Sequence, residues 1–559
     1  MNHKNKILNV GLLADSHIAS KYIFDLAEWG QKQDNLKIKY LVVQRIKRPN
    51  KLYKKIANHI KGKNLLNIVQ NIGFTIIKII ESCMLSKNKL HGDHLKKFDL
   101  KLIFKNIIEI KPIVSKSGFI YRYSSEEIKK ILNLNLDVLI RCGSGILRGE
   151  ILNCARFGII SFHHGDNTIN RGGPPGFWEV YFKQDSTGFT IQQLTEELDG
   201  GNILMRGHVT TQPWYLLNQA NLYLKSYFFI KKFLIELSNN HELPKIINSI
   251  PYFNPLYKQP NIYVQLNYSG YLVSKLFNSI IDKYILRRSN SWGVAFSYND
   301  WKKIAMWNSV KIQNTAGHFL ADPFVYSCEK GNYCFVEDFD YNLKKGSIKV
   351  YKLYETRAEE VGQAIVEKFH LSYPYLFEYE SKLYMCPESA ENRDIRIYEC
   401  IEFPLEWKLK KIIKSNVSAV DSTIFEFENL WWLFTSIDSL KNGDNCSELH
   451  IYFSKNPLTD NWEPHNKNPI FVDSRKARMG GLIIDEKKIY RVGQRQGFYQ
   501  YGKSLSINEI ITLNKNEYIE QLITEIEANF FPGLSGTHHL HSNGKITVFD
   551  FVKICNINN

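Results

Sequence analysis

Two adjacent histidines, His163 and His164, directly follow an apolar run in ISFHHGDNTINRGGPPGFWEV, residues 160–180. Asp166 comes after them, and a Gly-Gly-Pro-Pro turn closes the stretch. An imidazole beside a carbonyl group can stabilise developing negative charge or relay a proton, and a nearby carboxylate orients the ring and raises its pKa. If the apolar run is a strand, Ser161 and His163 share one face. The stretch therefore indicates the edge of an active site, with simple chain reversal as the plainer alternative.

The elements around this stretch alternate between strand-like and helix-like runs. Strands are expected at 6–15, 39–46, 136–147 and 159–165, and helices at 16–29 and 123–135. Such alternation predicts an α/β domain, Rossmann-like, with a mainly parallel sheet and helices on both faces. Ligands bind beyond the carboxyl ends of the strands in these sheets. His163 is expected at such an end.

A family resemblance is carried by two segments, LDVLIRCGSGILRGEILNCARFGIISFHHGDNTINRGGPPGFWEVY and DSTGFTIQQLTEELDGGNIL. They contain an apolar strand ending in an Asn-x-His position, an Arg-Gly-x-x-Pro loop, a Thr-Gly-x-Thr strand and a Leu-Asp-x-Gly turn. This order resembles the folate-dependent formyltransferases, which include methionyl-tRNA formyltransferase, glycinamide ribonucleotide transformylase and the sugar N-formyltransferases. The resemblance covers roughly residues 5–215, and it implies a formyltransferase-like domain at 1–215 with an insertion at about 45–100.

The resemblance implies 10-formyltetrahydrofolate as co-substrate and no metal. It places the family's catalytic histidine on His163, its aspartate on Asp199 and its asparagine on Ser161. The implied pterin-binding residues are Arg141, Cys142, Gly143, Ser144, Gly145, Ile146 and Leu147. The implied acceptor-binding residues are His164, Asp166, Asn167, Arg171 and Gly172.

Ser161 departs from the family pattern. An amine that attacks a formyl carbon creates an oxyanion and an ammonium, and each needs a partner. A serine hydroxyl reaches less far than an asparagine amide, and loss of an oxyanion donor typically costs about a hundredfold or more in rate. We therefore expect that His164 or Asn167 compensates, or that the activity has changed.

A basic insertion contains a second feature, the segment LLNIVQNIGFTIIKIIESCML at 65–85. Its polar residues recur at helical spacing, which predicts an amphipathic helix. Such a helix either covers a domain core or lies on an anionic membrane surface, where its flanking lysines would assist binding. Residues 216–290 are predicted to form a helical extension and a linker.

From residue 291 to 559 the pattern changes to short strands. Five similar segments, FLADPFVY, LSYPYLFEY, AVDSTIFEF, ARMGGLIID and GTHHLHSNG, recur about every fifty to sixty residues and predict an all-β, five-bladed propeller. The first residues of innermost strands point into the central funnel. This gathers Asp322, Tyr373, Asp421, Arg478 and His538, and Glu388 at the end of a second strand is expected to join them.

These pieces resemble the five-bladed furanosidase-like glycosidases. The SYP, MCPES, RMGG and THHLH pieces more closely resemble the N-terminal domain of plant glucosamine inositolphosphorylceramide transferases. Two carboxylates with separated pKa values can supply a base and an acid for glycoside chemistry, and Asp322 and Glu388 are the candidates. The alternative is a domain that only binds a glycan.

Composition limits the function classes. The 559 residues carry a formal charge of +16, which favours phosphates, nucleotide sugars or an anionic membrane face as partners, although a lysine-rich proteome explains it equally well. No nucleic-acid motif appears, so no nucleic-acid partner is expected. Nine cysteines without close pairs favour a reducing cytoplasm, with peripheral attachment to the inner membrane face left open.

Three functions follow from these observations. The first is transfer of a formyl group to an amino sugar carried on a nucleotide or a lipid, with a propeller that binds or processes the glycan. The second is glycosidase or glycosyl-transfer chemistry in the propeller, beside a non-catalytic formyltransferase-like module. The third is a glycan-binding scaffold at a membrane.

Overall fold

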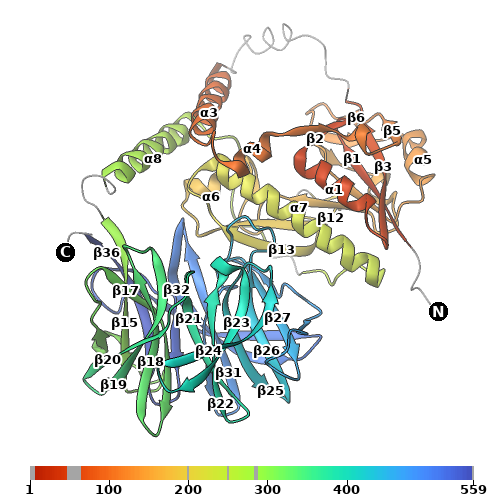
Figure 1. Cartoon of the computed structure of the whole chain (residues 1–559). Helices are drawn as coiled ribbons and strands as arrows, with labels where there is room; N and C mark the ends of the chain where they lie inside the picture. The colour runs from red at the N-terminus through yellow and green to blue at the C-terminus, as the bar shows by residue number, and fades with distance from the viewer. Residues whose placement is uncertain (1–6, 47–64, 198–199, 248–250, 282–287, 557–559) are drawn as a thin grey trace. The chain divides into compact units, whose positions relative to one another are not determined.

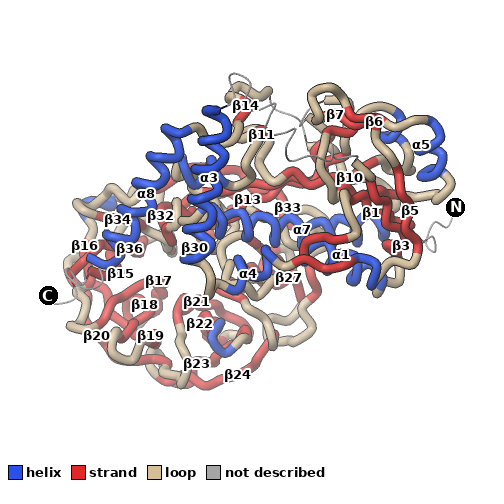
Figure 2. Tube along the Cα trace, turned by 90° about the horizontal axis from the view of Figure 1, so that it is seen from above, coloured by secondary structure: helices blue, strands red, loops and turns tan. Residues whose placement is uncertain are grey.

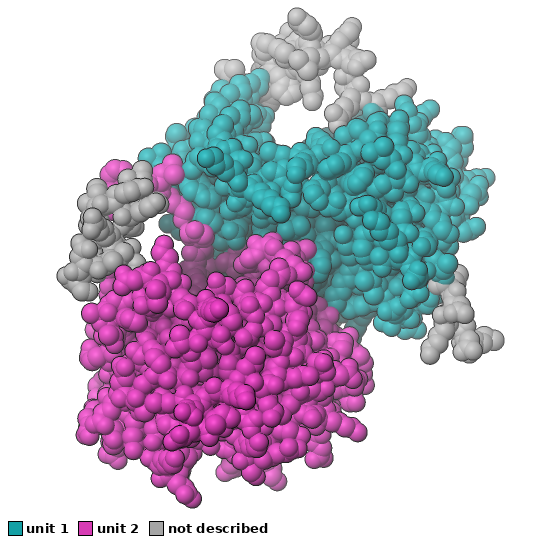
Figure 3. Space-filling model, in the orientation of Figure 1, with its two compact units in different colours: residues 1–207, 211–273 teal, residues 208–210, 274–559 magenta. Residues whose placement is uncertain are grey.

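The chain divides into two units in the computed structural model, residues 1–207 with 211–273 and residues 208–210 with 274–559 (Figures 1 and 3). The structure describes residues 7–46, 65–197, 200–247, 251–281 and 288–556. The first unit combines helices with one large sheet, and the second unit is built from strands. The predicted class, an α/β region followed by an all-β region, is confirmed.

The large sheet of the first unit positions the histidine stretch. Its strand order is β13-β12-β10-β8-β1-β3-β5. Strands β1, β8, β10, β3 and β5 pair in parallel, and β10 pairs with β12 in antiparallel fashion. The carboxyl ends of β1, β8 and β10 therefore meet at one edge of the sheet. The bounds are β1 Leu8–Ala14, β3 Leu36–Gln44, β5 Asn106–Ile110, β8 Val138–Arg141, β10 Ile159–His163, β12 Ser186–Gln193 and β13 Asn202–Thr210.

Helices cover this sheet. Helix α7 (Tyr215–Asn240) contacts β3, β10 and β12, and α5 (Ser125–Leu132) begins with a Ser124 cap that accepts a hydrogen bond from the Glu127 amide. The helix expected at 16–29 begins later, as α1 (Lys21–Gln31), because Ile18–Ser20 form strand β2 and pair with β4 (Lys97–Asp99). That pairing leaves Ser16 in the loop between β1 and β2, beside the sheet edge.

The insertion contributes two described helices, α3 (Leu65–Met84) and α4 (Lys89–Leu95), while residues 47–64 lie outside the described residues. The Glu81 side chain of α3 is buried, and its carboxylate accepts hydrogen bonds from the Tyr215 and Leu216 amides and the Tyr268 hydroxyl. Tyr268 belongs to α8 (Ile262–Ile280). No described helix is long and apolar enough to cross a membrane.

The second unit contains three separate antiparallel sheets and one nine-stranded sheet. In the nine-stranded sheet, β30–β33 join β15, β16 and β34–β36 through one parallel pair, Ile483 with Ser542. Five strands contact one another in the order β17, β21, β25, β30 and β35, and β35 contacts β17. Figure 2 shows several of these sheets from above. The bounds of these five strands are β17 His318–Cys328, β21 Ser372–Tyr379, β25 Ala419–Phe427, β30 Met479–Asp485 and β35 Leu540–Ser542.

The two ends of the second unit pair with each other. Strand β15 (Arg288–Ser297) pairs along its length with β36 (Thr547–Asn556). This pairing covers a strand edge that would otherwise be open.

Candidate functional site

The first candidate site lies at the carboxyl ends of β8 and β10. Ser161 pairs with Arg141 on one side and with Gln192 on the other, and His163 pairs with Thr190. Two cavities open here. A small cavity of about 140 Å³ is lined by Arg141, Gly145, Ile146, Leu147, Ser161, His163 and Gln192, among others. A large cavity of about 350 Å³ is lined by Asp15, Ser16, Ser20, Arg141, Ser161, His164, Tyr223 and Tyr227, among others.

The predicted pterin-binding stretch is a fixed turn. The Arg141 guanidinium donates to the Gly145 carbonyl, and the Ser144 amide donates to both oxygens of Asp15 at 3.0 Å. Gly145 has φ +85°, and a Cβ there would lie 2.2 Å from the Tyr121 ring, so only glycine suits this position. The glycine lets the backbone line the small cavity.

The predicted site residues fall into two groups. Gly145, Ile146, Leu147 and His163 line the small cavity, Cys142, Gly143 and His164 line the large one, and Arg141 and Ser161 line both. The two cavities therefore share Arg141 and Ser161 as lining residues.

His164 is held against aromatic side chains. Its ring stacks on Tyr223 at 3.7 Å between centroids, and its Nδ1 lies 3.1 Å from the Ser226 hydroxyl. Burial lowers the pKa of His164 to about 3, so the ring is neutral near pH 7. A neutral, stacked ring can shape the large cavity but does not supply a positive charge.

Four predicted acceptor-binding residues instead stabilise their own loop. Asp166 accepts hydrogen bonds from the Thr168 amide and hydroxyl, and Arg171 donates to the Asn167 carbonyl. Gly172 approaches Tyr257 so closely that a Cβ would lie 2.0 Å from its carbonyl oxygen. The residues lining the two cavities do not include Asp166, Asn167, Arg171 or Gly172. Asp199 lies outside the described residues.

The second candidate site lies in the all-β unit. Asp322, Tyr373 and Asp421 stand near the starts of β17, β21 and β25, each at a break in the strand register. All three have left-handed backbones, with φ of 49°, 47° and 52°. Such conformations are costly for residues other than glycine, and their recurrence at one position of the repeat marks it as special.

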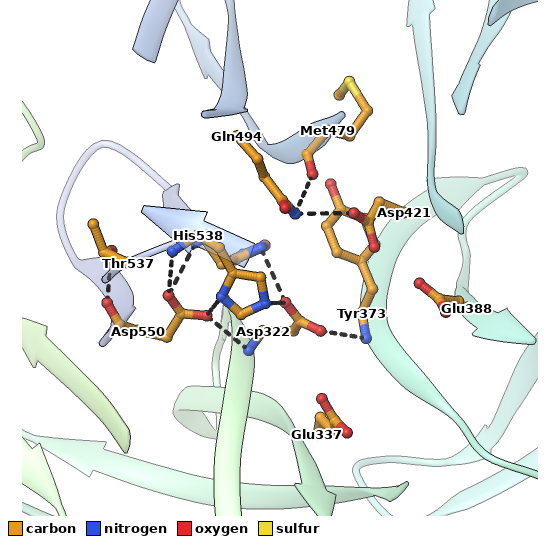
Figure 4. A network of polar contacts seen from close by, with 12 residues as sticks. Asp322, Glu337, Tyr373, Glu388, Asp421, Met479, Gln494, Thr537, His538 and Asp550 are labelled. Atoms are coloured by element: carbon orange, nitrogen blue, oxygen red, sulfur yellow. Dashed lines mark hydrogen bonds and ion pairs between the residues drawn. The ribbon is translucent and has the colours of Figure 1, made fainter. Parts of the chain in front are cut away.

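These residues form one polar network with their neighbours (Figure 4). His538 lies 3.3 Å from Asp322 through Nε2 and 2.7 Å from Asp550 through Nδ1. Arg478 donates to Asp421 at 2.6 Å and lies 3.6 Å from Glu388. The network thus brings together every residue predicted for the funnel: Asp322, Tyr373, Glu388, Asp421, Arg478 and His538.

Burial sets the protonation of this network. It raises the pKa of Asp322 to about 7, and it raises the pKa of Glu388 and Glu337 well above their usual range. Burial alone would lower the pKa of His538, but Asp550 and Asp322 raise it above its usual value. The cluster therefore combines protonated carboxyl groups with the ion pair of Arg478 and Asp421. This mixture can supply both an acid and a base.

Three members of the cluster were not predicted: Glu337, Gln494 and Asp550. Glu337 pairs with Ala321 just as Glu388 pairs with Ser372, one residue before the left-handed position of each sheet. The internal repeat could have identified Glu337 from Glu388. Donor atoms of Asp322, His538 and Asp550 lie within 4.8 Å of one another, a set that a cation could also use.

The sequence comparisons match these two units to different proteins. Residues 285–534 match the family described as glucosamine inositolphosphorylceramide transferase 1, N-terminal. The chain is 39% identical over 212 residues to glucosamine inositolphosphorylceramide transferase 1 of Arabidopsis thaliana, covering 36% of this chain and 27% of that protein. It is 26% identical over 194 residues to methionyl-tRNA formyltransferase of Bacillus subtilis, covering 34% and 58%.

A solved structure is also similar. The α-L-arabinofuranosidase of Lactobacillus brevis aligns with 14% identity and a TM-score of 0.31, over 43% of this chain and 92% of that one. The chain thus spans about a quarter of the plant relative and somewhat more than half of the bacterial formyltransferase.

Proposed function

We propose that the first unit transfers a formyl group from 10-formyltetrahydrofolate to the primary amine of a sugar carried on a nucleotide or a lipid. The observation that carries this proposal is the pair of cavities that share Ser161 and Arg141 in their linings. One cavity suits the formyl donor and the other suits the amine, so the two reactants would meet beside His163. The similarity to methionyl-tRNA formyltransferase supports the same reaction type.

The residues present fit a folate donor. The turn at Gly145–Leu147 offers backbone groups to the small cavity, and the buried amide of Gln192 faces the same space. When bound, the donor supplies an activated formyl carbon. Arg141 holds the turn through the Gly145 carbonyl, and His163 lies where it can accept a proton from the amine.

The choice of an amino sugar has separate support. The relative that matches the second unit's family is named for glucosamine, which carries a primary amine. We infer that the second unit is a closed five-bladed propeller that binds or processes the same glycan. The ring of contacts among β17, β21, β25, β30 and β35 supports the closed arrangement.

A direct assay tests the first function. Purified protein is incubated with 10-formyltetrahydrofolate and a panel of nucleotide-linked amino sugars, and products are identified by mass. We expect a formylated sugar from the native protein and none from the Asp199→Asn variant. Failure of every acceptor, together with failure to bind 5-formyltetrahydrofolate, would reject the proposal.

Glycoside chemistry in the second unit is the other candidate. The network of Asp322, Glu388 and Asp421 favours it, because the pKa of the first two is raised while Asp421 is paired with Arg478. Glu388→Gln should abolish hydrolysis of a reporter glycoside and leave formyl transfer unchanged. If neither substitution changes any activity, both units act as glycan-binding modules.

A further inference from the structure

We propose that Gln192 supplies the amide hydrogen bond that stabilises the formyl oxygen during transfer, in place of the family's asparagine at the Ser161 position. This inference rests on the formyl-transfer function proposed above. It names a catalytic group on β12, whereas the sequence pattern points to β10.

The position of Gln192 supports this role. It pairs with Ser161 across β10 and β12, and it lines the small cavity together with Ser161 and His163. Gln192 is only 4% exposed. Its Oε1 has no hydrogen-bond partner, and among the described residues none bonds to its side-chain amide.

A buried amide without a partner is unfavourable, because it has lost water and gained nothing in return. Such groups persist where a ligand completes them. The neighbouring Gln193 shows the ordinary case, because its side chain donates to the Phe157 carbonyl and accepts from Asn202. The buried Oε1 of Gln192 therefore points to a bound polar group in the small cavity, and the Nε2–H of the same amide, which no described residue accepts, is left to donate.

The other candidates for this role either contact other groups or do not line the cavities. The Ser161 hydroxyl donates to the Phe162 carbonyl at 3.3 Å, and the His164 ring stacks on Tyr223. Asn167 is not among the residues that line either cavity. The compensation expected from His164 or Asn167 is thus better supplied by Gln192.

In the chemical step, Gln192 acts only as a hydrogen-bond donor. The amine nitrogen forms a bond to the formyl carbon, and the bond between that carbon and N10 of the folate breaks. The amine loses one proton, N10 gains one, and His163 is placed to carry it. Gln192 Nε2–H donates to the formyl oxygen as negative charge develops, and no proton moves onto the amide.

The test is steady-state kinetics on the full chain. Gln192→Leu should lower kcat about a hundredfold or more, with a smaller change in KM for the formyl donor. Ser161→Asn should restore much of that loss in the Gln192→Leu background, because it returns an amide to the family position. The matched control is Gln193→Leu, which changes a glutamine on the opposite face and should leave kcat within about threefold.

The outcomes separate the two claims. If the native protein transfers formyl and Gln192→Leu retains kcat within threefold, the role of Gln192 is overturned and the formyl-transfer function stands. If the native protein transfers nothing, binding of 5-formyltetrahydrofolate decides. Unchanged binding in Gln192→Leu overturns the inference, whereas no binding by the native protein overturns both.

A different observation carries a second proposal, on helices α3 and α8. We infer that the outer face of α3, continued by the start of α8, docks on an anionic membrane surface. On α3 the residues Val69, Ile72, Ile76 and Ile79 are each about half exposed, at 48–57%, and on α8 Tyr263 and Leu266 are 70% and 67% exposed.

Contacts on the inner side of α3 and α8 fix which face of each helix is exposed. Gln265 of α8 donates to the Gln70 carbonyl of α3 at 2.8 Å, and the Tyr268 hydroxyl contacts the buried Glu81. The inner face is already packed, with Phe74 3% exposed. The apolar outer face is therefore a fixed surface feature.

Positive charge beside the apolar face of α3 indicates an anionic lipid surface as its partner. Lys87 and Lys89 are exposed directly after α3, and the whole chain carries a formal charge of +16. An apolar helix face flanked by cations binds the boundary between headgroups and acyl chains, and anionic lipids strengthen that binding.

Vesicle flotation of the full chain tests this surface. Binding to vesicles containing phosphatidylglycerol should exceed binding to phosphatidylcholine vesicles at least tenfold, and Ile72→Gln with Ile76→Gln should remove it. Leu102→Gln with Ile113→Gln, at other exposed apolar positions, is the matched control and should bind normally. No binding by the native protein overturns the proposal. A dimer in light scattering that Ile72→Gln with Ile76→Gln dissolves would instead assign the face to a second copy.

Discussion

Burial changes the protonation of His164 in the first unit and of Asp322 in the second unit in opposite directions, because one group is charged when protonated and the other when deprotonated. In the first unit it removes a proton, because the pKa of His164 falls to about 3 and the stacked ring stays neutral. In the second unit it adds protons, because the pKa of Asp322 rises to about 7 and that of Glu388 rises with it. The first site is a pair of cavities, whereas the second is a buried network of carboxyl groups, a histidine and an arginine.

This difference separates two kinds of chemistry. Transfer between a bound donor and a bound amine needs space, a proton carrier and a hydrogen-bond donor, and the cavities beside His163 offer these. Acid–base cleavage of a glycoside needs two carboxyl groups held in different protonation states. The two carboxyl groups have different surroundings, because Asp421 is paired with Arg478 whereas Asp322 lies beside His538.

The largest expected effect is on activity, and it tests whether the two sites work separately. His163→Asn should reduce formyl transfer by about 10²–10⁴-fold, because it removes the proton carrier. The same substitution should leave any glycosidase activity of the second unit within experimental error. Parallel assays of both activities check this, and a loss of both in His163→Asn would break the comparison.

The next largest effect is on the stability of the second unit. Arg478→Met leaves Asp421 buried without its partner, and breaking a buried pair in this way costs about 3–5 kcal/mol. Denaturant unfolding with hydrogen exchange of peptides from β25 and β30 measures the loss. Arg357→Met removes an exposed partner of Glu359 and should cost less than about 1 kcal/mol. Equal costs for the two substitutions would show that the network is not a buried charge pair.

Local sequence predicted the strand edge at His163 well, because an apolar strand followed by a polar loop is recorded in consecutive residues. It missed Gln192, because that residue reaches the site only through the antiparallel pairing of β12 with β10. The loop residues Asp166 and Arg171 looked like binding groups from their types alone. Their hydrogen bonds inside the loop depend on a folded turn that periodicity does not reveal.

The second unit repeats this lesson. The five similar segments predicted the inner strands, and Asp322, Tyr373 and Asp421 stand where the repeat placed them. Asp550 could not be found in the same way, because it joins the cluster only when β36 at the end of the chain returns beside β15. The sequence left two places open for the apolar face of α3, a domain core or a membrane surface. The side that turns inward is fixed by Glu81, because its carboxylate accepts hydrogen bonds from the amides at the start of α7.

A smaller effect concerns the pH dependence of stability. Its sign should differ between the contribution of Asp322 in the second unit and that of His164 in the first. Between about pH 4 and 7 the native second unit binds more protons at Asp322 than the unfolded chain does, so its stability falls as the pH rises through 7. Between about pH 6.5 and 3 the native first unit binds fewer protons at His164, so its stability falls as the pH drops. Hydrogen exchange at pH 5 and pH 8, corrected for intrinsic rates, should therefore show pH-dependent differences of opposite sign when the native protein is compared with Asp322→Asn and with His164→Phe. Asp322→Asn should weaken the trend in the second unit.

The smallest effect tests whether the His164 ring causes the acid sensitivity of the first unit's stability. His164→Phe keeps an aromatic ring against Tyr223 but loses the contact with Ser226, which should cost about 1 kcal/mol at pH 8. Phenylalanine cannot be protonated, so the variant should lose less stability than the native protein when the pH is lowered to 5. Unfolding curves of both proteins at pH 8 and pH 5 measure the two losses of stability. An equal loss in both proteins would mean that the acid sensitivity of the first unit arises from other groups.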